Sequence, residues 1–199
     1  MTEFWLNTLL AVLLGYTLGS IPFAMILTRL GGAGDLRMIG SGNIGATNVL
    51  RTGRKGLAAL TLILDLLKGT AAVLLARHFL PGTEIIAAAA AFFGHLYPVW
   101  IGFKGGKGLA TYAGILFGLF WPLGLGYAAA WIALLGLTRI SSVAGLGAAA
   151  VAPVLAWGAG RTEYVPALVA ISVIAFWKHR TNIERLIAGT EPRVGKSKA

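Results

Sequence analysis

The sequence predicts an all-α, polytopic integral membrane protein: a bundle of seven transmembrane helices with the N-terminus outside and the C-terminus in the cytoplasm. The first observation is composition, because 57% of the 199 residues are hydrophobic and only 12% are charged, with a mean hydropathy of +0.78. Soluble domains carry about 25% charged residues. The second observation is that long apolar stretches alternate with short basic segments, and the third is that these basic segments fall on one side.

The apolar stretches define the expected spans, since about 20 apolar residues cross the hydrocarbon core. Residues 109–138 contain no charge, and as one straight helix they would extend about 45 Å, which exceeds that core. Pro122 follows Trp121 near the middle, and a proline favours a helix break. This stretch is therefore predicted to form two short helices. The other five expected spans are residues 4–27, 57–76, 85–101, 142–157 and 164–177.

The orientation follows from the basic residues. With the N-terminus outside, almost all of the 17 Lys and Arg residues fall on the inner side, including those of the C-terminal tail. Only Arg77 and Arg161 fall on the outer side, and Lys68 lies within a span. This asymmetry obeys the positive-inside rule. Five or six spans would place Arg139 or the basic tail outside and would fit less well.

Composition also excludes several classes of function. The net charge of +10 would suggest nucleic acid in a soluble protein, but here membrane orientation explains it, so no nucleic-acid partner is expected. The chain has no cysteine and its three histidines lack metal-ligand spacing, so we expect neither a metal nor a cofactor. Residues 1–199 are expected to form one membrane-embedded domain. Asp65 and Lys68 share a face within a span and are predicted to form an internal ion pair, the alternative being a role near the substrate.

The first of three polar clusters lies in residues 40–51. Its Ser-Gly-Asn start is rich in turn-forming residues. Asn43, Thr47 and Arg51 are spaced by four, so on a helix they would share a face. The alternative is an N-cap followed by a short amphipathic helix at the membrane interface.

The second cluster lies in residues 94–108, where Lys104 and Lys107 stand among glycines. We expect the Gly-Gly-Lys-Gly turn to leave backbone N–H groups bare for an anion such as phosphate, with the lysines adding charge. It is not a P-loop, because Gly108 stands where Ser or Thr is required. Residues 108–111 are predicted to open a helix, whose N-terminus adds partial positive charge. The alternative is a basic loop that only sets orientation.

The third cluster lies in residues 178–191. The chain is predicted to leave the membrane at Trp177 and to continue as a helix that stops at Gly189. His179, Asn182 and Arg185 recur at a spacing of three and so share a face. The alternative is a basic amphipathic tail on anionic lipid.

By this topology the three clusters and Ser142 face the cytoplasm, and orientation alone does not require Ser, Asn or His there. At these residues the chain resembles one family, the bacterial acyl-phosphate-dependent glycerol-3-phosphate acyltransferases, PlsY. The three short cytoplasmic motifs of that family are matched by residues 40–51, 94–111 and 178–191. The resemblance covers the order, spacing and topology of nearly the whole chain.

The resemblance implies seven transmembrane helices in the bacterial inner membrane, an active site at the cytoplasmic leaflet and, we expect, a monomer. It implies transfer of a fatty acyl group from acyl phosphate to the 1-hydroxyl of glycerol 3-phosphate, the first acylation step of phospholipid synthesis. The products are 1-acyl-glycerol 3-phosphate (lysophosphatidic acid) and phosphate. Because acyl phosphate carries a good leaving group, positioning and charge stabilisation suffice, and we expect direct attack without an acyl-enzyme.

The resemblance also implies roles for individual residues. The loop would hold one phosphate and Arg51 the other, while the base is either a phosphate oxygen of the donor or His179. Glu191 would organise basic side chains. The implied catalytic residues are Ser41, Asn43, Arg51, Lys104, His179 and Asn182. The implied substrate- or phosphate-binding residues are Gly42, Asn48, Gly105, Gly106, Lys107, Gly108, Thr111, Ser142, Arg185 and Glu191.

Two other functions are kept as alternatives. An acyltransferase that uses acyl-CoA or acyl-carrier protein would show a His-x-x-x-x-Asp pattern, but Trp100 follows His95 at that offset and Glu184 follows His179. A transporter of an organic phosphate would favour polar clusters at both membrane faces or along a pore. The outer side of this chain is nearly bare of such residues, so the transporter is the weaker alternative.

Overall fold

The computed structural model describes residues 2–195, and every regular element in them is a helix, as the predicted all-α class requires. The chain divides into two compact units, Met1–Phe120 and Trp121–Ala199, and each is described by itself. The single domain expected over residues 1–199 stays a prediction. Lys196 and Lys198, which contributed to the charge asymmetry, lie outside the described residues.

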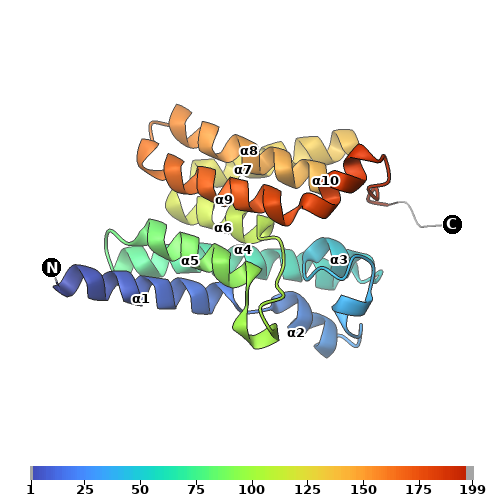
Figure 1. Ribbon diagram of the computed structural model, residues 1–199, viewed down its shortest axis with the longest axis horizontal. Coiled ribbons are helices and arrows are strands. Elements are labelled where there is room, and N and C mark those ends of the chain that lie inside the picture. The colour runs from blue at the N-terminus through green and yellow to red at the C-terminus, as the bar shows by residue number, and fades with distance from the viewer. Residues whose placement is uncertain (1, 196–199) are drawn as a thin grey trace. The chain divides into compact units, whose positions relative to one another are not determined.

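The longer helices of the first unit pack side by side in two pairs (Figure 1). Its elements in chain order are α1 (Thr2–Gly19), α2 (Phe23–Leu30), η1 (Leu36–Met38), α3 (Ala46–Leu50), α4 (Lys55–Phe79), α5 (Glu84–Leu96), η2 (Val99–Ile101) and α6 (Leu109–Leu119). Helix α1 packs along α5, and α4 packs along α6. The loops of the unit connect these paired helices and the short helices.

Glycine makes these two pairings close. A Cβ on Gly15 of α1 would collide with the carbonyl oxygen of Ala87 in α5. A Cβ on Gly114 of α6 would likewise collide with the carbonyl oxygen of Leu66 in α4. Small residues allow helix backbones to approach in lipid, so part of the glycine-rich composition is explained by packing.

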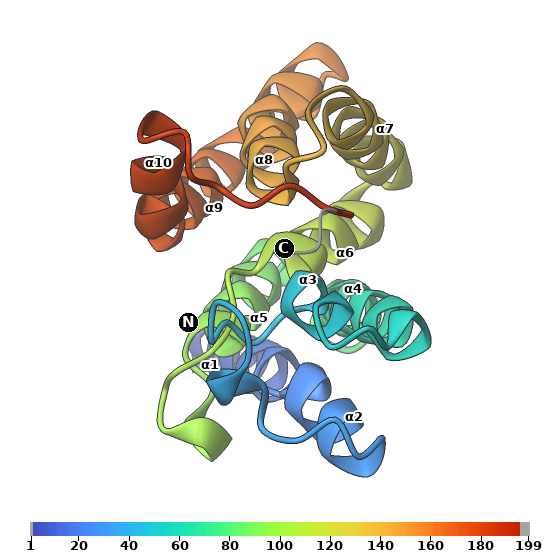
Figure 2. The same cartoon turned by 90° about the vertical axis from the view of Figure 1, so that its right-hand side faces the viewer.

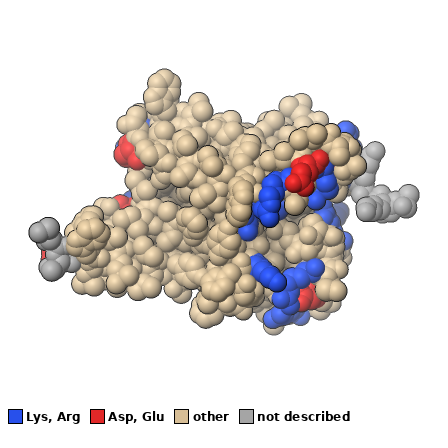
Figure 3. Space-filling model, in the orientation of Figure 1, with Lys and Arg blue, Asp and Glu red and all other residues tan. Residues whose placement is uncertain are grey.

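The described part of the second unit consists of three longer helices, a short α-helix and one 3₁₀ turn. These elements are α7 (Trp121–Thr138), α8 (Ser141–Gly158), η3 (Thr162–Tyr164), α9 (Val165–Lys178) and α10 (Arg180–Ile187). Helix α8 packs against both α7 and α9, as Figure 2 shows. The Ser172 hydroxyl donates to the Ala149 carbonyl over 2.6 Å and so joins α9 to α8. On the face shown in Figure 3, most Lys and Arg side chains gather at one end of each unit.

Five helical stretches of the described residues are long and apolar enough to cross a membrane. Helix α6 is apolar but shorter, and α9 is also short, so the seven spans and the orientation of the termini stay predictions. The predicted break at Trp121 and Pro122 is confirmed, because α6 ends at Leu119 and α7 begins at Trp121. The five stretches are Glu3–Leu30, Lys55–Phe79, Glu84–Ile101, Trp121–Thr138 and Ser141–Gly158.

The span predicted over residues 4–27 is not one continuous helix. Helices α1 and α2 are separated by a turn that contains Pro22, which has no N–H to continue a helical ladder. The carbonyl of Ile21 in this turn accepts a hydrogen bond of 2.9 Å from Lys68 Nζ. This carbonyl also accepts the Phe23 N–H over 3.1 Å, so a side chain of α4 adds a second donor to the irregular backbone of the turn.

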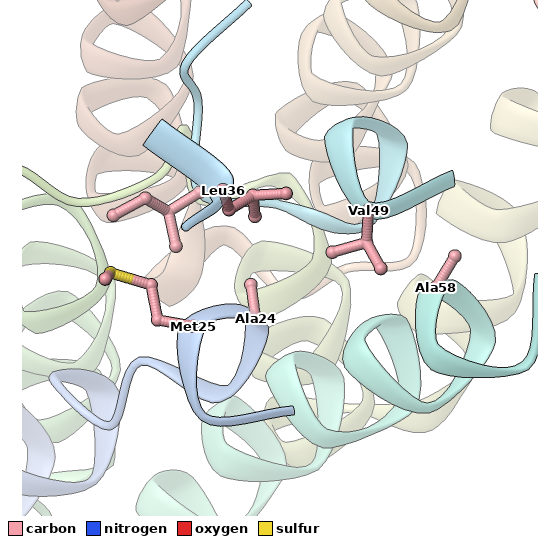
Figure 4. Packing of buried hydrophobic residues seen from close by; sticks show 6 residues of the cluster. Ala24, Met25, Leu36, Val49 and Ala58 are labelled. Carbon is pink, nitrogen blue, oxygen red and sulfur yellow. The ribbon is translucent and has the colours of Figure 1, made fainter. Parts of the chain in front are cut away.

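A small apolar core holds the segment between α2 and α4 in place. Figure 4 shows side chains from α2, η1, α3 and α4 meeting in it. The segment contains the first polar cluster, so this core positions residues 40–51 relative to α4. The buried members are Ala24, Met25, Leu36, Ile44, Val49 and Ala58.

Candidate functional site

The basic loop of residues 102–108 turns sharply and then opens α6. Gly102 and Gly108 have φ of 65° and 83°, in the left-handed region that glycine enters at little cost. Gly108 is the N-cap residue of α6, which confirms the predicted helix start. A Cβ on Gly108 would also collide with the ring of Phe92, so close packing against α5 requires glycine here.

The backbone amides of this loop are not bare, and that expectation is wrong for two of its glycines. The Gly105 N–H donates to the Leu96 carbonyl and the Gly106 N–H donates to the His95 carbonyl, each over 3.1 Å. Both carbonyls lie at the C-terminus of α5, where helical partners run out. A Cβ on Gly105 or Gly106 would collide with His95, so the two glycines let the loop lie directly on α5.

Positive charge in this region therefore comes mainly from side chains. Lys104 is exposed and Lys107 is half-buried. The N-terminus of α6 adds partial positive charge immediately after them. The loop thus carries two lysines next to a helix N-terminus, while two of its amides stabilise the loop itself.

A buried polar network lies behind the loop. Asp65 Oδ1 and Lys68 Nζ are 2.7 Å apart, so the predicted ion pair is confirmed. His95 Nδ1 lies 3.7 Å from Asp65 Oδ1 and 3.1 Å from Thr111 Oγ1. All four side chains are buried. Thr111, which the resemblance assigned to phosphate, contacts His95 behind the loop, and its phosphate role stays a prediction.

The first polar cluster is a loop up to Gly45 and then forms a helix shorter than its spacing suggested. Helix α3 covers only Ala46–Leu50, so the helical face predicted to join Asn43, Thr47 and Arg51 is wrong. Asn43 precedes the helix and Arg51 is its C-cap residue. Gly45 marks the difference, because this N-cap residue is extended, with φ of −162° and ψ of 163°, so the helix begins only after it.

Asn48 braces the loop that carries Ser41. The buried Asn48 amide donates to the carbonyls of Leu36 and Ile39 over 3.1 and 2.9 Å. Its Oδ1 accepts a 3.2 Å hydrogen bond from the Ser41 N–H. These bonds fix the loop, and a direct contact of Asn48 with substrate stays a prediction.

The first two clusters meet within the first unit. A Cβ on Gly106 of the basic loop would lie 2.6 Å from the Ile44 carbonyl oxygen of the first cluster. The Arg51 side chain lies over Gly40, since a Cβ there would be 2.9 Å from Arg51 Cδ. Ser41 and Arg51 are exposed, as is Lys104. This unit therefore contains an exposed hydroxyl and exposed basic side chains on two adjoining segments.

The third cluster, in the second unit, is organised around Glu191. Its side chain is only 6% exposed. Glu191 Oε1 accepts from Ser142 Oγ over 2.7 Å and from Asn182 Nδ2 over 2.5 Å, and Oε2 accepts from Arg185 Nε over 2.7 Å. Asn182 and Arg185 thus share a face of α10, as their spacing predicted. Ser142 joins them from the start of α8.

Two opposing effects act on the Glu191 carboxyl group. Burial raises the pKa of Glu191, but hydrogen bonds from Asn182, Ser142 and Arg185 outweigh burial and hold the pKa below its ordinary value of 4.5. The group is therefore a carboxylate at neutral pH and can only accept hydrogen bonds. It fixes three donors in one arrangement.

His179 lies at a turn and not within a continuous helix. Helix α9 ends at Lys178 and α10 begins at Arg180, so the single helix predicted beyond Trp177 is interrupted there, and Gly189 follows α10 with a φ of 68°. His179 Nδ1 is 2.7 Å from the Ala175 carbonyl, which can only accept. Nδ1 therefore carries the proton, and Nε2 is the basic nitrogen of the neutral ring.

The sequence reasoning missed two features of these clusters. It did not connect His95 with Asp65, although a histidine inside the second cluster and an ion pair in a neighbouring span were both visible. It also did not identify Glu191 as the common acceptor of Ser142, Asn182 and Arg185. Both features depend on contacts between residues far apart in sequence or on different helices, for which local spacing carries no signal.

Comparisons with known proteins agree with one another. A family model described as glycerol-3-phosphate acyltransferase matches residues 9–189. A glycerol-3-phosphate acyltransferase of Erythrobacter litoralis is 56% identical over 97% of this chain and 98% of its own. One of Mesorhizobium japonicum is 57% identical over 94% of this chain and 96% of its own.

Solved structures give the same result. The crystal structure of PlsY (YgiH), an integral membrane glycerol 3-phosphate acyltransferase, in its glycerol 3-phosphate form has a TM-score of 0.89 and 36% identity, covering 94% of this chain and 96% of that one. Its lysphosphatidic acid form has a TM-score of 0.86 and 33% identity, with coverage of 94% and 95%. With the family match over most of its length, the chain belongs to the glycerol-3-phosphate acyltransferase family.

Proposed function

We propose that this integral membrane acyltransferase takes its acyl group from an acyl phosphate and transfers it to the 1-hydroxyl of glycerol 3-phosphate. The products are 1-acyl-glycerol 3-phosphate and inorganic phosphate. The observation that carries the proposal is that the basic loop and the first polar cluster adjoin at Gly106 and Ile44. The segment of Lys104 and Lys107 therefore lies beside the segment of Ser41 and Arg51. Both the proposed donor and the acceptor bring a phosphate to such a site.

The reaction needs one bond to form and one to break. The 1-hydroxyl oxygen attacks the acyl carbonyl carbon, and the bond from that carbon to the phosphate oxygen breaks. The hydroxyl proton passes to a phosphate oxygen of the donor, whose second pKa is about 6, or to Nε2 of His179. The chain has no cysteine and needs no acyl-enzyme, because phosphate is already a good leaving group.

In the first unit we assign charge stabilisation to the basic residues. Lys104 and Lys107, with Gly108 at the N-terminus of α6, hold one phosphate, and Arg51 holds the other. Ser41 and Asn43 donate hydrogen bonds near the reacting carbonyl. The exposure of Lys104, Arg51 and Ser41 supports these roles, because a soluble phosphate can reach them.

In the second unit we assign orientation of the glycerol portion to His179, Asn182 and Ser142. Glu191 holds Ser142, Asn182 and Arg185 in a fixed arrangement and does not itself act on the substrate. We propose that both units are required for one reaction. Arg185 then contributes charge that the Glu191 carboxylate keeps in place.

We further propose the cellular setting. Seven spans with the N-terminus outside place all three clusters at the cytoplasmic face of the bacterial inner membrane, where a soluble glycerol 3-phosphate meets a lipid-borne donor. The basic residues of the inner loops support this orientation. We propose that the enzyme acts as a monomer in phospholipid synthesis.

The choice of donor is tested directly with purified protein in detergent. Palmitoyl phosphate and glycerol 3-phosphate should give 1-palmitoyl-glycerol 3-phosphate and phosphate, measured by mass spectrometry and phosphate release, while palmitoyl-CoA should give none. Turnover only with palmitoyl-CoA or with an acylated carrier protein would overturn the proposed donor. Flux of glycerol 3-phosphate into proteoliposomes without any product would favour a transporter.

The phosphate roles are tested by Lys104→Ala and Arg51→Ala. Each should lower kcat/KM by at least about a hundredfold, because a preorganised charge at the reacting phosphates is lost. Thermal unfolding should stay close to that of the parent, since both side chains are exposed. Lys55→Ala is the matched control, an exposed lysine of the same unit that should keep full activity. A variant at position 104 or 51 with the parent rate would refute its assigned role.

The role of Glu191 is tested by Glu191→Gln, which replaces one acceptor oxygen with an NH₂ group. We expect kcat/KM to fall at least about tenfold, as a charge-assisted hydrogen bond is lost. Because the folded state lowers the pKa of Glu191, its stabilising effect is complete above the ordinary value of 4.5 and is lost as the pH falls through the folded value. The difference in unfolding temperature between parent and variant should therefore shrink as the pH falls below 4.5.

A matched control for this comparison is Glu163→Gln, at an exposed carboxylate 4.0 Å from Arg161. It should change neither activity nor the pH dependence of unfolding measurably. A Glu191→Gln enzyme with the parent kcat/KM would show that the fixed arrangement is not needed for the reaction.

A further inference from the structure

We propose that Asp65, Lys68, His95 and Thr111 form a positioning network that fixes the basic loop of residues 102–108 for phosphate binding. The inference rests on the proposed phosphate role of that loop. It assigns these four buried side chains a task beyond mutual neutralisation.

The lysine of the ion pair also bonds to backbone outside the regular helices. Lys68 Nζ is 2.7 Å from Asp65 Oδ1 and donates over 2.9 Å to the carbonyl of Ile21. Ile21 lies in the turn between α1 and α2, beside Pro22. The buried ammonium has three N–H donors, and it directs one of them to a carbonyl outside α4. Lys68 instead ties α4 to the break in the first span.

His95 connects the ion pair to the loop. Its Nδ1 lies 3.7 Å from Asp65 Oδ1 and 3.1 Å from Thr111 Oγ1. The opposite edge of its ring borders Gly106, because a Cβ on that glycine would collide with His95 Nε2. The His95 carbonyl also accepts the Gly106 N–H over 3.1 Å. One residue therefore contacts the loop through both its ring and its backbone.

The four side chains lie away from any space in this structure that could hold a substrate phosphate. The cavity that Asp65, Lys68 and His95 share with Gly105 and Gly106 has a volume of about 10 Å³. That volume holds at most one water molecule, far less than a phosphate group requires. Thr111 is fully buried. The network therefore acts through the loop, and its members are positioning residues.

The decisive variant is the charge-neutral double substitution Asp65→Asn with Lys68→Met. Removing one partner of a buried ion pair leaves an unpaired charge, whereas replacing both is often tolerated. We expect the double variant to unfold within a few degrees of the parent but to bind glycerol 3-phosphate roughly tenfold more weakly or worse. Binding is measured by calorimetry in detergent, with inorganic phosphate as a second probe. Parent-like affinity in a folded double variant would overturn the proposal.

Thr111→Val provides an independent arm, because it removes only the hydroxyl that contacts His95. It should raise the dissociation constant and the KM for glycerol 3-phosphate by roughly tenfold, and Thr111→Ser should restore most of the loss. The matched control is Thr61→Val, at an equally buried threonine whose hydroxyl bonds only within α4, to Leu57. It should bind as the parent does. If Thr111→Val binds like Thr61→Val, the network does not position the loop.

These measurements are separable from the test of the donor. Binding of glycerol 3-phosphate and of phosphate requires no acyl donor, so it reports on the loop even if palmitoyl phosphate is not turned over. Failure of the donor assay alone would leave the network intact, and loss of the binding effect alone would overturn the network while the donor stands.

Discussion

The structure of the first unit depends on one constraint: buried irregular backbone at the ends of its apolar helices must find hydrogen-bond partners within the protein. Two irregular segments meet this constraint, the turn between α1 and α2 and the loop of residues 102–108. Lys68 satisfies the carbonyl of Ile21 in the turn. The last carbonyls of α5 accept the amides of Gly105 and Gly106 in the loop. These hydrogen bonds therefore also fix both irregular segments against the helices.

In the anion binding that we propose, this arrangement gives backbone and side chains different roles. In the basic loop, two amides are committed to α5, so Lys104, Lys107 and the start of α6 provide the positive charge. In the second unit a side chain takes the organising role, because the carboxylate of Glu191 accepts hydrogen bonds from Ser142, Asn182 and Arg185 and holds them in place. Both solutions produce rigid polar groups on a scaffold of apolar helices, which suits a reaction that depends on positioning.

Local signals in the sequence predicted part of this structure. Pro122 marked the break between α6 and α7, and the spacing of Asp65 and Lys68 marked their ion pair. The prediction was wrong at Pro22, because the continuous hydropathy of residues 4–27 indicated one helix although the proline breaks it. The glycines of residues 105–106 also misled, since bare amides are inferred from a local turn, whereas their acceptors lie on α5. Long-range partners such as His95 and Asp65 have no local pattern, so they required the three-dimensional structure.

The most direct test of this account is amide hydrogen exchange at Gly105 and Gly106, measured by NMR in lipid nanodiscs. If the loop is held on the end of α5, both amides should exchange about as slowly as those of the last turn of that helix. Binding of glycerol 3-phosphate should change these rates little, because the bonds exist before substrate arrives. Exchange at the rate of an open loop, with protection appearing only on adding glycerol 3-phosphate, would contradict the account and restore the amides as phosphate ligands.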